Sequence, residues 1–271
     1  MNSALAGLLA LVPALAPTIG DEPKPPASAP DTAVDAAPET PMPADLRGTW
    51  RFDLRVVSHA TVAVLGTTEV KSRTIFLATV SGTRAQPTVH TAACHIHAEP
   101  SRALAQTLVP QGFVDALPQK TFPAELTWNG EQWSFHGDMR PQYIGYDPGI
   151  SDDELPQHRD DPGITDLEGD GHPGATIHLD VPLFGLVEMY MVQRTHTILD
   201  GTWSGADIWE GTATVRGFSQ RTIGASNRLF VANAEVALDN ENSRFRWARV
   251  PMGTTCAKLR EGVGAAPGGP F

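Results

Sequence analysis

Carboxylate side chains are concentrated in one segment of the sequence, residues 147–172, which holds nine acidic residues and one basic residue. Near the end of this segment the acids fall on alternate positions, at Asp166, Glu168 and Asp170. Gly171 follows at once. A tight loop with this spacing turns alternate side-chain oxygens toward one point, as a hard cation such as calcium requires. We therefore expect a calcium site in this loop.

The run from Asp166 to Gly171 resembles the D-x-[DN]-x-[DN]-G loop that binds calcium in EF-hands and in many secreted bacterial repeats. The resemblance implies that Asp166, Glu168 and Asp170 are the first, third and fifth ligands. It also implies that His172 contributes its backbone carbonyl. Gly171 stands where that family has an invariant glycine, which allows the sharp turn.

The sequence departs from that family's pattern at three places. Glu168 is longer than the usual Asp or Asn, Ile177 replaces the bidentate Glu of the twelfth position, and Pro173 precedes a strand-like segment instead of a helix. We expect a calcium loop without the helix-loop-helix frame, with a further ligand from outside the loop. A solvated acidic insertion is the alternative interpretation. The nearest additional carboxylates in sequence are Asp180, Asp160 and Asp161.

A second group of metal-ligating side chains lies at His95 and His97, with Glu99 two positions further. His-x-His on a strand places both imidazoles on one face, an arrangement that suits zinc. If Cys94 is disulfide-bonded, Cys94 and Ile96 are expected to point inward and both histidines outward. A zinc site and a metal-dependent enzyme are therefore one hypothesis, and surface histidines beside a disulfide are the other. The candidates for a third ligand are His136, His178 and His196.

Motifs for nucleophilic catalysis are absent from the sequence. It has no G-x-S-x-G, no Ser/His/Asp order with a local signature and no Gly-rich phosphate loop. Acidic residues on expected strands leave a pair for glycoside hydrolysis open, with solvent-facing acids as the alternative. We expect a protein without catalytic activity. The strand acids are Asp53, Glu125, Glu188 and Glu210.

The elements that position these side chains are predicted to be strands. Period-two alternation with β-branched and aromatic residues recurs along the chain, and Gly or polar breaks separate the runs. The expected strands cover residues 49–57, 61–65, 71–80, 88–98, 125–128, 132–136, 175–181, 186–198, 207–218, 228–237 and 245–250.

These strands predict an all-β protein: a single antiparallel barrel or sandwich of about ten strands, with the acidic loop as a long insertion at residues 147–174. Asn129-Gly130 between two tryptophan-bearing runs predicts a hairpin with a type I′ turn. The one helical possibility is residues 101–108, bounded by prolines. The six tryptophans either fill the core or line a ligand cavity.

Gly48-Thr49-Trp50 at the start of the first strand resembles the G-x-W that opens lipocalin-type (calycin) barrels. In that family an arginine of the last strand packs over the tryptophan. The resemblance covers only the two ends of the body, and it implies a small-molecule carrier. The arginines that could take this part are Arg244, Arg246 and Arg249.

Composition and charge bound the remaining possibilities. The chain has 271 residues and a formal net charge of −11, and most of the acidity lies in the loop and in residues 17–45. That second segment is rich in Pro and Ala, which predicts a disordered linker before a folded domain at residues 46–260. Residues 261–271 read as a disordered tail. No basic stripe interleaved with aromatics occurs, so nucleic acid is an unexpected partner.

The N-terminal segment, residues 1–16, is predicted to be a signal peptide because residues 4–16 form a short apolar run that ends in Ala-Leu-Ala. An Ala-rich disordered tail is the alternative. The run is too short to span a membrane. Cys94 and Cys256 are expected to form a disulfide in an oxidising compartment.

These observations favour an exported protein, secreted, periplasmic or at the cell surface. The first hypothesis is a non-catalytic, calcium-stabilised β-protein with a structural or binding role. The alternatives are a lipocalin-like carrier of a small apolar ligand and a zinc enzyme that uses His95 and His97. The sequence identifies no partner, substrate or ligand.

Overall fold

The computed structural model describes residues 46–62, 66–83, 86–100, 105–149, 154–205, 207–231 and 235–262. The predicted signal peptide, the predicted linker and residues 263–271 of the predicted tail lie outside these ranges. The strands are β1 (Gly48–Val62), β2 (Gly66–Gly82), β3 (Pro87–Pro100), β4 (Gln106–Leu108), β5 (Lys120–Trp128), β6 (Trp133–Ile144), β7 (Ala175–Val181), β8 (Gly185–Gly205), β9 (Ile208–Ala225) and β10 (Glu235–Arg249). The helices are α1 (Gln111–Ala116), α2 (Cys256–Glu261) and the 3₁₀ turn η1 (Arg228–Phe230).

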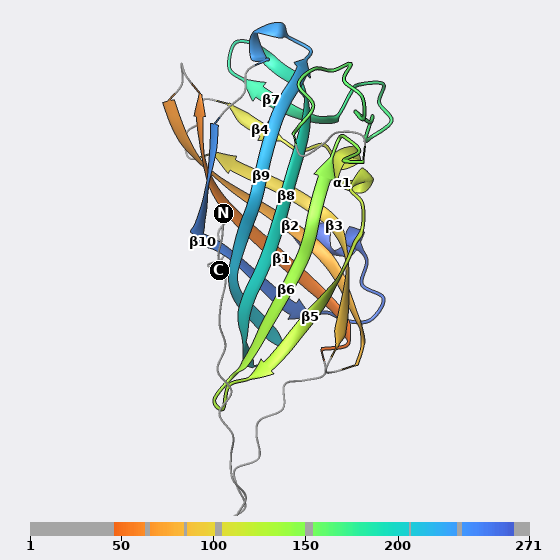
Figure 1. Ribbon diagram of the computed structural model, residues 1–271, viewed down its shortest axis with the longest axis vertical. Helices are drawn as coiled ribbons and strands as arrows, with labels where there is room; N and C mark the ends of the chain where they lie inside the picture. The colour runs from red at the N-terminus through yellow and green to blue at the C-terminus, as the bar shows by residue number, and fades with distance from the viewer. Residues whose placement is uncertain are drawn as a thin grey trace, which may run out of the picture. The chain divides into compact units, whose positions relative to one another are not determined.

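Eight strands form a closed antiparallel ring in the order β1-β2-β3-β5-β6-β8-β9-β10, and β10 pairs back with β1 (Figure 1). Each strand of the ring therefore neighbours the next strand of the ring along the chain. The two remaining strands are outside the ring, since β7 pairs with β8 beyond the end of β6, and β4 pairs with β7. The expected all-β antiparallel architecture is confirmed, and it takes the form of a barrel.

Aromatic side chains fill one end of the barrel. Trp50, Phe52 and Leu54 alternate along β1 and enter this core, each at most 7% exposed. Burying a side chain of this size stabilises the fold by roughly 1.5–3 kcal/mol. The rings contact one another at centroid distances near those of favourable aromatic pairs. The aromatic residues below 2% exposure are Trp50, Phe52, Phe122, Phe135, Trp209, Phe245 and Trp247.

A smaller cluster on the outer face of β2 and β3 holds the C-terminal helix. Ile75 lies there with Leu77, Cys94 and Leu259 of α2, and the predicted Cys94–Cys256 disulfide is present. The expectation that Cys94 points inward with Ile96 is wrong. The β2–β3 register shifts between Ile75 and Phe76, so a bulge at Cys94 places it on the same outer face as its neighbour His95.

Several expected elements differ in the structure. One long strand, β1, covers residues 49–57 and 61–62 of the two expected strands, and β10 is likewise continuous through residues 245–249. Residues 63–65 and 232–234 of the expected strands lie outside the described residues. Residues 228–230 form η1 instead of strand. The predicted helix at residues 101–108 is wrong for its described part, because residues 106–108 form β4, and the helix begins after Pro110. Residues 261 and 262 of the predicted tail end α2.

The Asn129-Gly130 hairpin is present, but its turn is not type I′. Trp128 pairs with Trp133, so four residues connect the strands. Only Gly130 of the connection has a positive φ. The Asn129 carboxamide oxygen accepts hydrogen bonds from the N–H groups of Glu131 and Gln132, at 2.9 and 2.8 Å. The Asn129 side chain therefore stabilises this turn, whereas the expected type I′ turn would have needed two residues in the left-handed conformation.

The ring opens toward the end opposite the aromatic core. β10 pairs with β9 only where residues 244–248 face residues 208–212, whereas its pairing with β1 continues to Glu235. Asn240 ends the seam, because its carboxamide bonds both the N–H and the carbonyl of Val215, at 2.9 and 3.2 Å. Beyond this point, toward Ala225 of β9 and Glu235 of β10, the two strands separate. Among the described residues, the structure contains no helix of the length and apolar character that crossing a membrane requires.

Candidate metal centre

The acidic loop leaves the barrel and returns to it at one place on the edge of β8. Ile144, the last residue of β6, pairs with Gln193, and Ala175, the first residue of β7, pairs with Met191. Thr165 links the two ends, because it donates its N–H to the Gly145 carbonyl at 3.0 Å and accepts the Gly174 N–H at 2.8 Å. The loop base is therefore fixed by backbone hydrogen bonds to the sheet.

Apolar residues of the loop cover the outer face of β8 and β9. Tyr146 is buried with Tyr190, Val192 and Ile223 of these strands. Leu155 and Ile164 of the loop pack against them, and Tyr146 forms a backbone bridge with Ile164. The described part of the loop contains no helix or strand, but its apolar base anchors it to the barrel.

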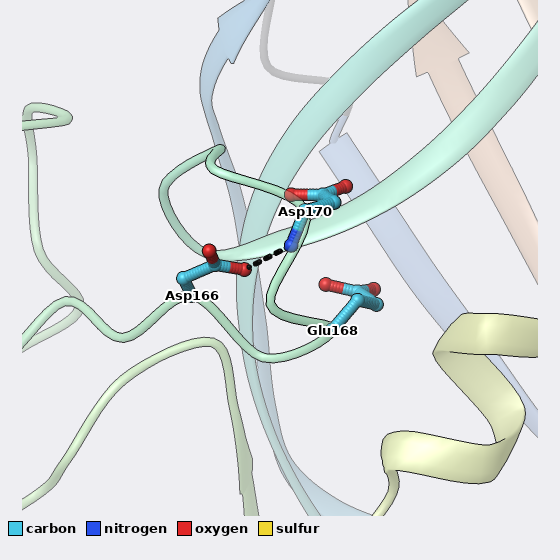
Figure 2. A group of neighbouring side chains, drawn as sticks. All are labelled: Asp166, Glu168 and Asp170. Atoms are coloured by element: carbon cyan, nitrogen blue, oxygen red, sulfur yellow. Dashed lines mark hydrogen bonds between the residues drawn. The ribbon is translucent and has the colours of Figure 1, made fainter.

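The carboxylates of Asp166, Glu168 and Asp170 converge (Figure 2). One ligand oxygen from each lies within 4.8 Å of the others, and this is the one group of three or more possible metal-ligating residues among the described residues. A calcium ion bound at 2.3–2.6 Å spaces its ligand oxygens at comparable distances. The three residues that alternate in sequence are therefore brought together in space.

Asp166 organises the turn that makes this convergence possible. Its Oδ1 accepts the N–H groups of Gly169 and Asp170 at 2.8 and 3.1 Å, and its Oδ2 accepts that of Gly171 at 2.8 Å. The Gly171 N–H, supported by the other two, holds the pKa of Asp166 below its ordinary value. Gly169 and Gly171 both have positive φ, which allows the chain to wrap around this carboxylate.

Thr176 on β7 connects the other two carboxylates to the sheet. Its backbone N–H donates to Glu168 Oε1 at 2.9 Å, and its hydroxyl donates to Asp170 Oδ2 at 2.8 Å. Thr176 is only 6% exposed, so these bonds position the acids from a buried strand residue. Thr176 was not among the residues predicted from the sequence. A threonine at the start of the strand that follows an acidic loop is too common a pattern to have identified it.

Glu168 is the most constrained of the three acids. Its Oε2 is buried and has no hydrogen-bond partner among the described residues. Burial raises the pKa of Glu168, and repulsion from Asp170 and Asp166 adds to that effect, against the opposing Thr176 N–H. An oxygen in this position carries charge that no neighbouring donor compensates. A cation at the point where the acids converge would compensate it.

Neither Asp180 nor Asp161 joins the group, and the His172 side chain lies apart from it; the backbone carbonyl of His172 as a ligand stays a prediction. The His172 ring stacks on Tyr190 with centroids 4.4 Å apart, and its Nε2 lies 3.8 Å from a Glu188 oxygen. Asp180 lies on β7 opposite Leu186 of β8 and Gln106 of β4, in a different part of that strand from Thr176. Asp161 uses one oxygen to accept the N–H groups of Gln157 and His158.

His95 and His97 lie side by side on the outer face of β3, with parallel rings 6.5 Å apart. His97 lies 3.3 Å from Glu99. No third metal-ligating residue completes a group with them in the ranges that the structure describes. Burial lowers the pKa of His95, and the positive charges of Arg260 and Arg73 contribute. Cationic neighbours of this kind also disfavour a bound metal cation.

The other predicted zinc ligands have partners of their own. His196 Nε2 lies 2.6 Å from Asp138, and His136 Nδ1 lies 2.7 Å from Asp200. His178 is on β7, opposite Leu108. The expected convergence on His95 and His97 therefore does not occur among these histidines.

A polar cluster that we did not predict surrounds the bulge in β6. Lys120 donates to the carbonyls of Met139 and Arg140 at 3.2 and 3.0 Å, and burial lowers its pKa to about 8. Arg140 has a φ of 60°, and its N–H donates to Asp138 at 2.7 Å. The ammonium group satisfies carbonyls that the bulge removes from the sheet ladder, which explains its burial.

Arg249 at the end of β10 lies over Trp50 of β1. Its guanidinium carbon is 4.3 Å from the centre of the indole ring. The same side chain donates to the Arg47 carbonyl at 2.8 Å and lies 3.1 Å from Asp207. It thus closes the aromatic end of the barrel.

Two cavities lie away from the carboxylates. One of about 520 Å³ lies where β9 and β10 separate, and its lining is Glu154, Leu155, Gln157, Phe218, Ser219, Gln220, Arg221 and Val236. The other, about 480 Å³, has the lining His97, Ala98, Glu99, Ala105, Gln106, Asp180 and Pro182.

Comparison with protein-family models, curated proteins and solved structures found no match to this chain.

Proposed function

We propose that this chain is an exported, non-catalytic β-barrel protein whose long loop is ordered by calcium, with a structural or binding role. A single observation carries the proposal. Three carboxylates converge within 4.8 Å, and one oxygen of the half-buried Glu168 has no partner among the described residues. Burying charge without compensation is costly, so the arrangement is best satisfied by a cation.

The chemistry of the ligands favours calcium over softer metals. All three groups offer oxygen, and the described part of the loop places no sulfur or imidazole in the group. Carboxylate oxygens that already accept one N–H retain a lone pair for a cation. Calcium accepts six to eight oxygens in a flexible geometry, so water and backbone carbonyls would complete its shell. Affinity in the range of extracellular modules, about 10⁻⁴–10⁻³ M, is expected for such a site.

Export is supported by the disulfide. Cys94 and Cys256 are joined across 162 residues, and such bonds persist in oxidising compartments. The apolar run at residues 4–16 has the length of a signal-peptide core. Both features agree with a site adapted to millimolar calcium.

The test is thermal unfolding of the full chain with calcium chloride or with EDTA. Calcium at a concentration of 100 times Kd should stabilise the fold by about 2.7 kcal/mol, and Asp170→Ala should abolish the rise in Tm. Asp180→Ala is the matched control, because this acid lies outside the converging group, and it should keep the full rise. An unchanged Tm of the parent chain in millimolar calcium would refute the proposal.

A second candidate is a carrier of the lipocalin type. It is supported by the sequential eight-stranded ring and by Arg249 of the last strand, which lies over Trp50 of the G-x-W tripeptide. The aromatic end is filled, which disfavours a ligand there. Any carried molecule would have to lie at the opening between β9 and β10, where the cavity lining is mostly polar. Binding of a small ligand that Gln220→Trp blocks, and Phe76→Leu does not, would favour this candidate.

A further inference from the structure

Exposed apolar side chains gather on two connections at the open end of the barrel. We call Leu183, Phe184, Leu186, Leu229 and Val231 the apolar tip. Within the described residues these are five of the seven large hydrophobic side chains that are exposed. Leu183 and Phe184 lie in the turn between β7 and β8, and Leu229 lies in η1, just after β9 (Figure 1). Clustering of this kind marks an interaction site.

The two connections form one rigid surface. Phe184 contacts Phe230 edge to face, with ring centroids 5.4 Å apart. Behind them, Ser226 donates its N–H to the Glu188 carbonyl at 2.9 Å, and the Glu188 N–H donates to the Ser226 hydroxyl at 3.0 Å. The tip is therefore held in place before anything binds, which lowers the entropy cost of binding.

Leu183 is the most informative residue of the tip. Its side chain is fully exposed, at 103%, and its backbone has a φ of 75°. A left-handed conformation costs a leucine roughly 1–2 kcal/mol, and a glycine or asparagine would avoid that cost. An exposed leucine in strained backbone contributes nothing to the barrel core. The barrel therefore gives no reason for a leucine here, whereas a contact outside the barrel would give one.

The shape and the chemistry of the tip indicate what it contacts. It consists of five side chains on the β7–β8 turn, the start of β8 and the segment at η1, whereas a stable protein interface uses 20–30 residues per partner. The exposed Arg228 adjoins Leu229, and Asn227 and Ser226 precede it. Apolar side chains with a guanidinium and polar groups just behind them match a bilayer surface, where acyl chains lie below phosphates.

We propose that the apolar tip inserts into the headgroup region of a phospholipid membrane, with Arg228 at the level of the phosphates. The membrane surface that fits is zwitterionic, because Asp180 and Glu188 flank the tip and the chain is acidic overall. Insertion of these side chains requires no complementary pocket. The inference is independent of calcium and goes beyond the proposed function.

A fluorophore at the tip tests the inference in the full chain. Leu183→Cys is labelled with acrylodan, which reacts at that site because both native cysteines are joined in a disulfide. Phosphatidylcholine vesicles should shift its emission to the blue. Met252→Cys is the matched control: it is 94% exposed and follows the opposite end of β10, and its label should not shift. The label reports contact at the tip alone, and lipid binding by the apolar run at residues 4–16 would not shift it.

Co-sedimentation with the same vesicles measures how much the apolar tip contributes to the free energy of membrane binding. Leu183→Ser with Phe184→Ser should lower the vesicle partition coefficient about tenfold or more, since two large apolar groups no longer insert. Met252→Ser should leave the coefficient unchanged. An unshifted label at position 183 would overturn the inference. So would a dimer that forms without lipid and that Leu183→Ser dissociates, because the tip would then be covered by a second copy.

Discussion

The main chains of Gly145 and Gly174 lie in direct contact, although the whole acidic loop separates them in sequence. A methyl group on Gly145 would lie 2.8 Å from the Gly174 Cα atom, and both glycines have positive φ, at 76° and 86°. This contact lets the chain leave β6 and re-enter the sheet as β7 along the same edge of β8. The candidate metal centre therefore rests on a closed loop base.

Gly174→Ala should open this base. Its Cβ would lie 2.6 Å from the Met191 carbonyl oxygen, in a backbone conformation that alanine avoids. The loss in free energy of unfolding should be about 2–3 kcal/mol or more, measured by urea denaturation. Gly169→Ala is the matched control, because its φ is 72° but no heavy atom lies within 4 Å. Gly169→Ala should lower the free energy of unfolding only by the cost of placing alanine in a left-handed conformation, about 1–2 kcal/mol. Equal losses would contradict the proposed contact.

Glu168→Gln should stabilise the protein in EDTA at neutral pH. Burial raises the pKa of Glu168 above its ordinary 4.5. Such a group binds its proton more tightly in the folded state. The stability it contributes is therefore complete below the unfolded pKa and is lost as pH rises through the folded pKa. Glutamine keeps the acceptor for Thr176 without the charge. The Tm advantage of the variant should grow as pH rises from about 4 to 7.

Calcium and a neighbouring acid supply the controls for this prediction. In millimolar calcium at neutral pH the order should reverse, because the parent chain keeps a ligand that the variant lacks. Asp166→Asn in EDTA should show the opposite trend, since backbone N–H groups lower the pKa of Asp166. Its contribution to stability is present above the unfolded pKa and is lost on acidification. Identical pH profiles for the two variants would argue against the assigned environments.

Arg249→Lys should destabilise the aromatic end of the barrel by about 1–2 kcal/mol, measured by thermal unfolding. The guanidinium covers the Trp50 ring and also bonds the Arg47 carbonyl, and a lysine ammonium cannot do both in the same plane. Arg246→Lys is the matched control on the same strand. Within the described residues the one ion pair of Arg246, with Glu210, spans 4.0 Å between partly exposed side chains, so a change within about 0.5 kcal/mol is expected.

Removal of the disulfide should cost about 2–4 kcal/mol, because the bond closes a loop of 162 residues in the unfolded chain. Cys94→Ala with Cys256→Ala is the variant, and the urea midpoint is the measurement. Leu259→Ala in the intact chain separates the helix packing from the crosslink, since Leu259 lies in the same cluster. A parent chain whose midpoint is unchanged by reductant would contradict the structural role of this bond.

The convergence of the three carboxylates could be predicted from sequence. The residues that hold them in place could not. Asp166, Glu168 and Asp170 converge because neighbours in a tight loop share one local geometry. Thr176 and the apolar base at Tyr146 depend on the pairing of β7 with β8 and on the packing of the loop against β9. Asp180 was expected near the loop on sequence distance alone. Each residue of an extended chain advances about 3.3 Å, so Asp180, further along β7 than Thr176, lies away from the three carboxylates.

Alternation of apolar residues determined the strand content and thus the all-β class, since each buried face requires period two. The presence of two cysteines in a chain expected to be exported predicted the disulfide. Alternation cannot register a bulge, so the outward position of Cys94 beside His95 was decided by the pairing of β2 with β3. Closure of the ring, the choice of Arg249 among the three arginines that could cover Trp50, and the apolar tip likewise depend on segments distant in sequence packing together. Their energies depend on neighbours that no local pattern specifies.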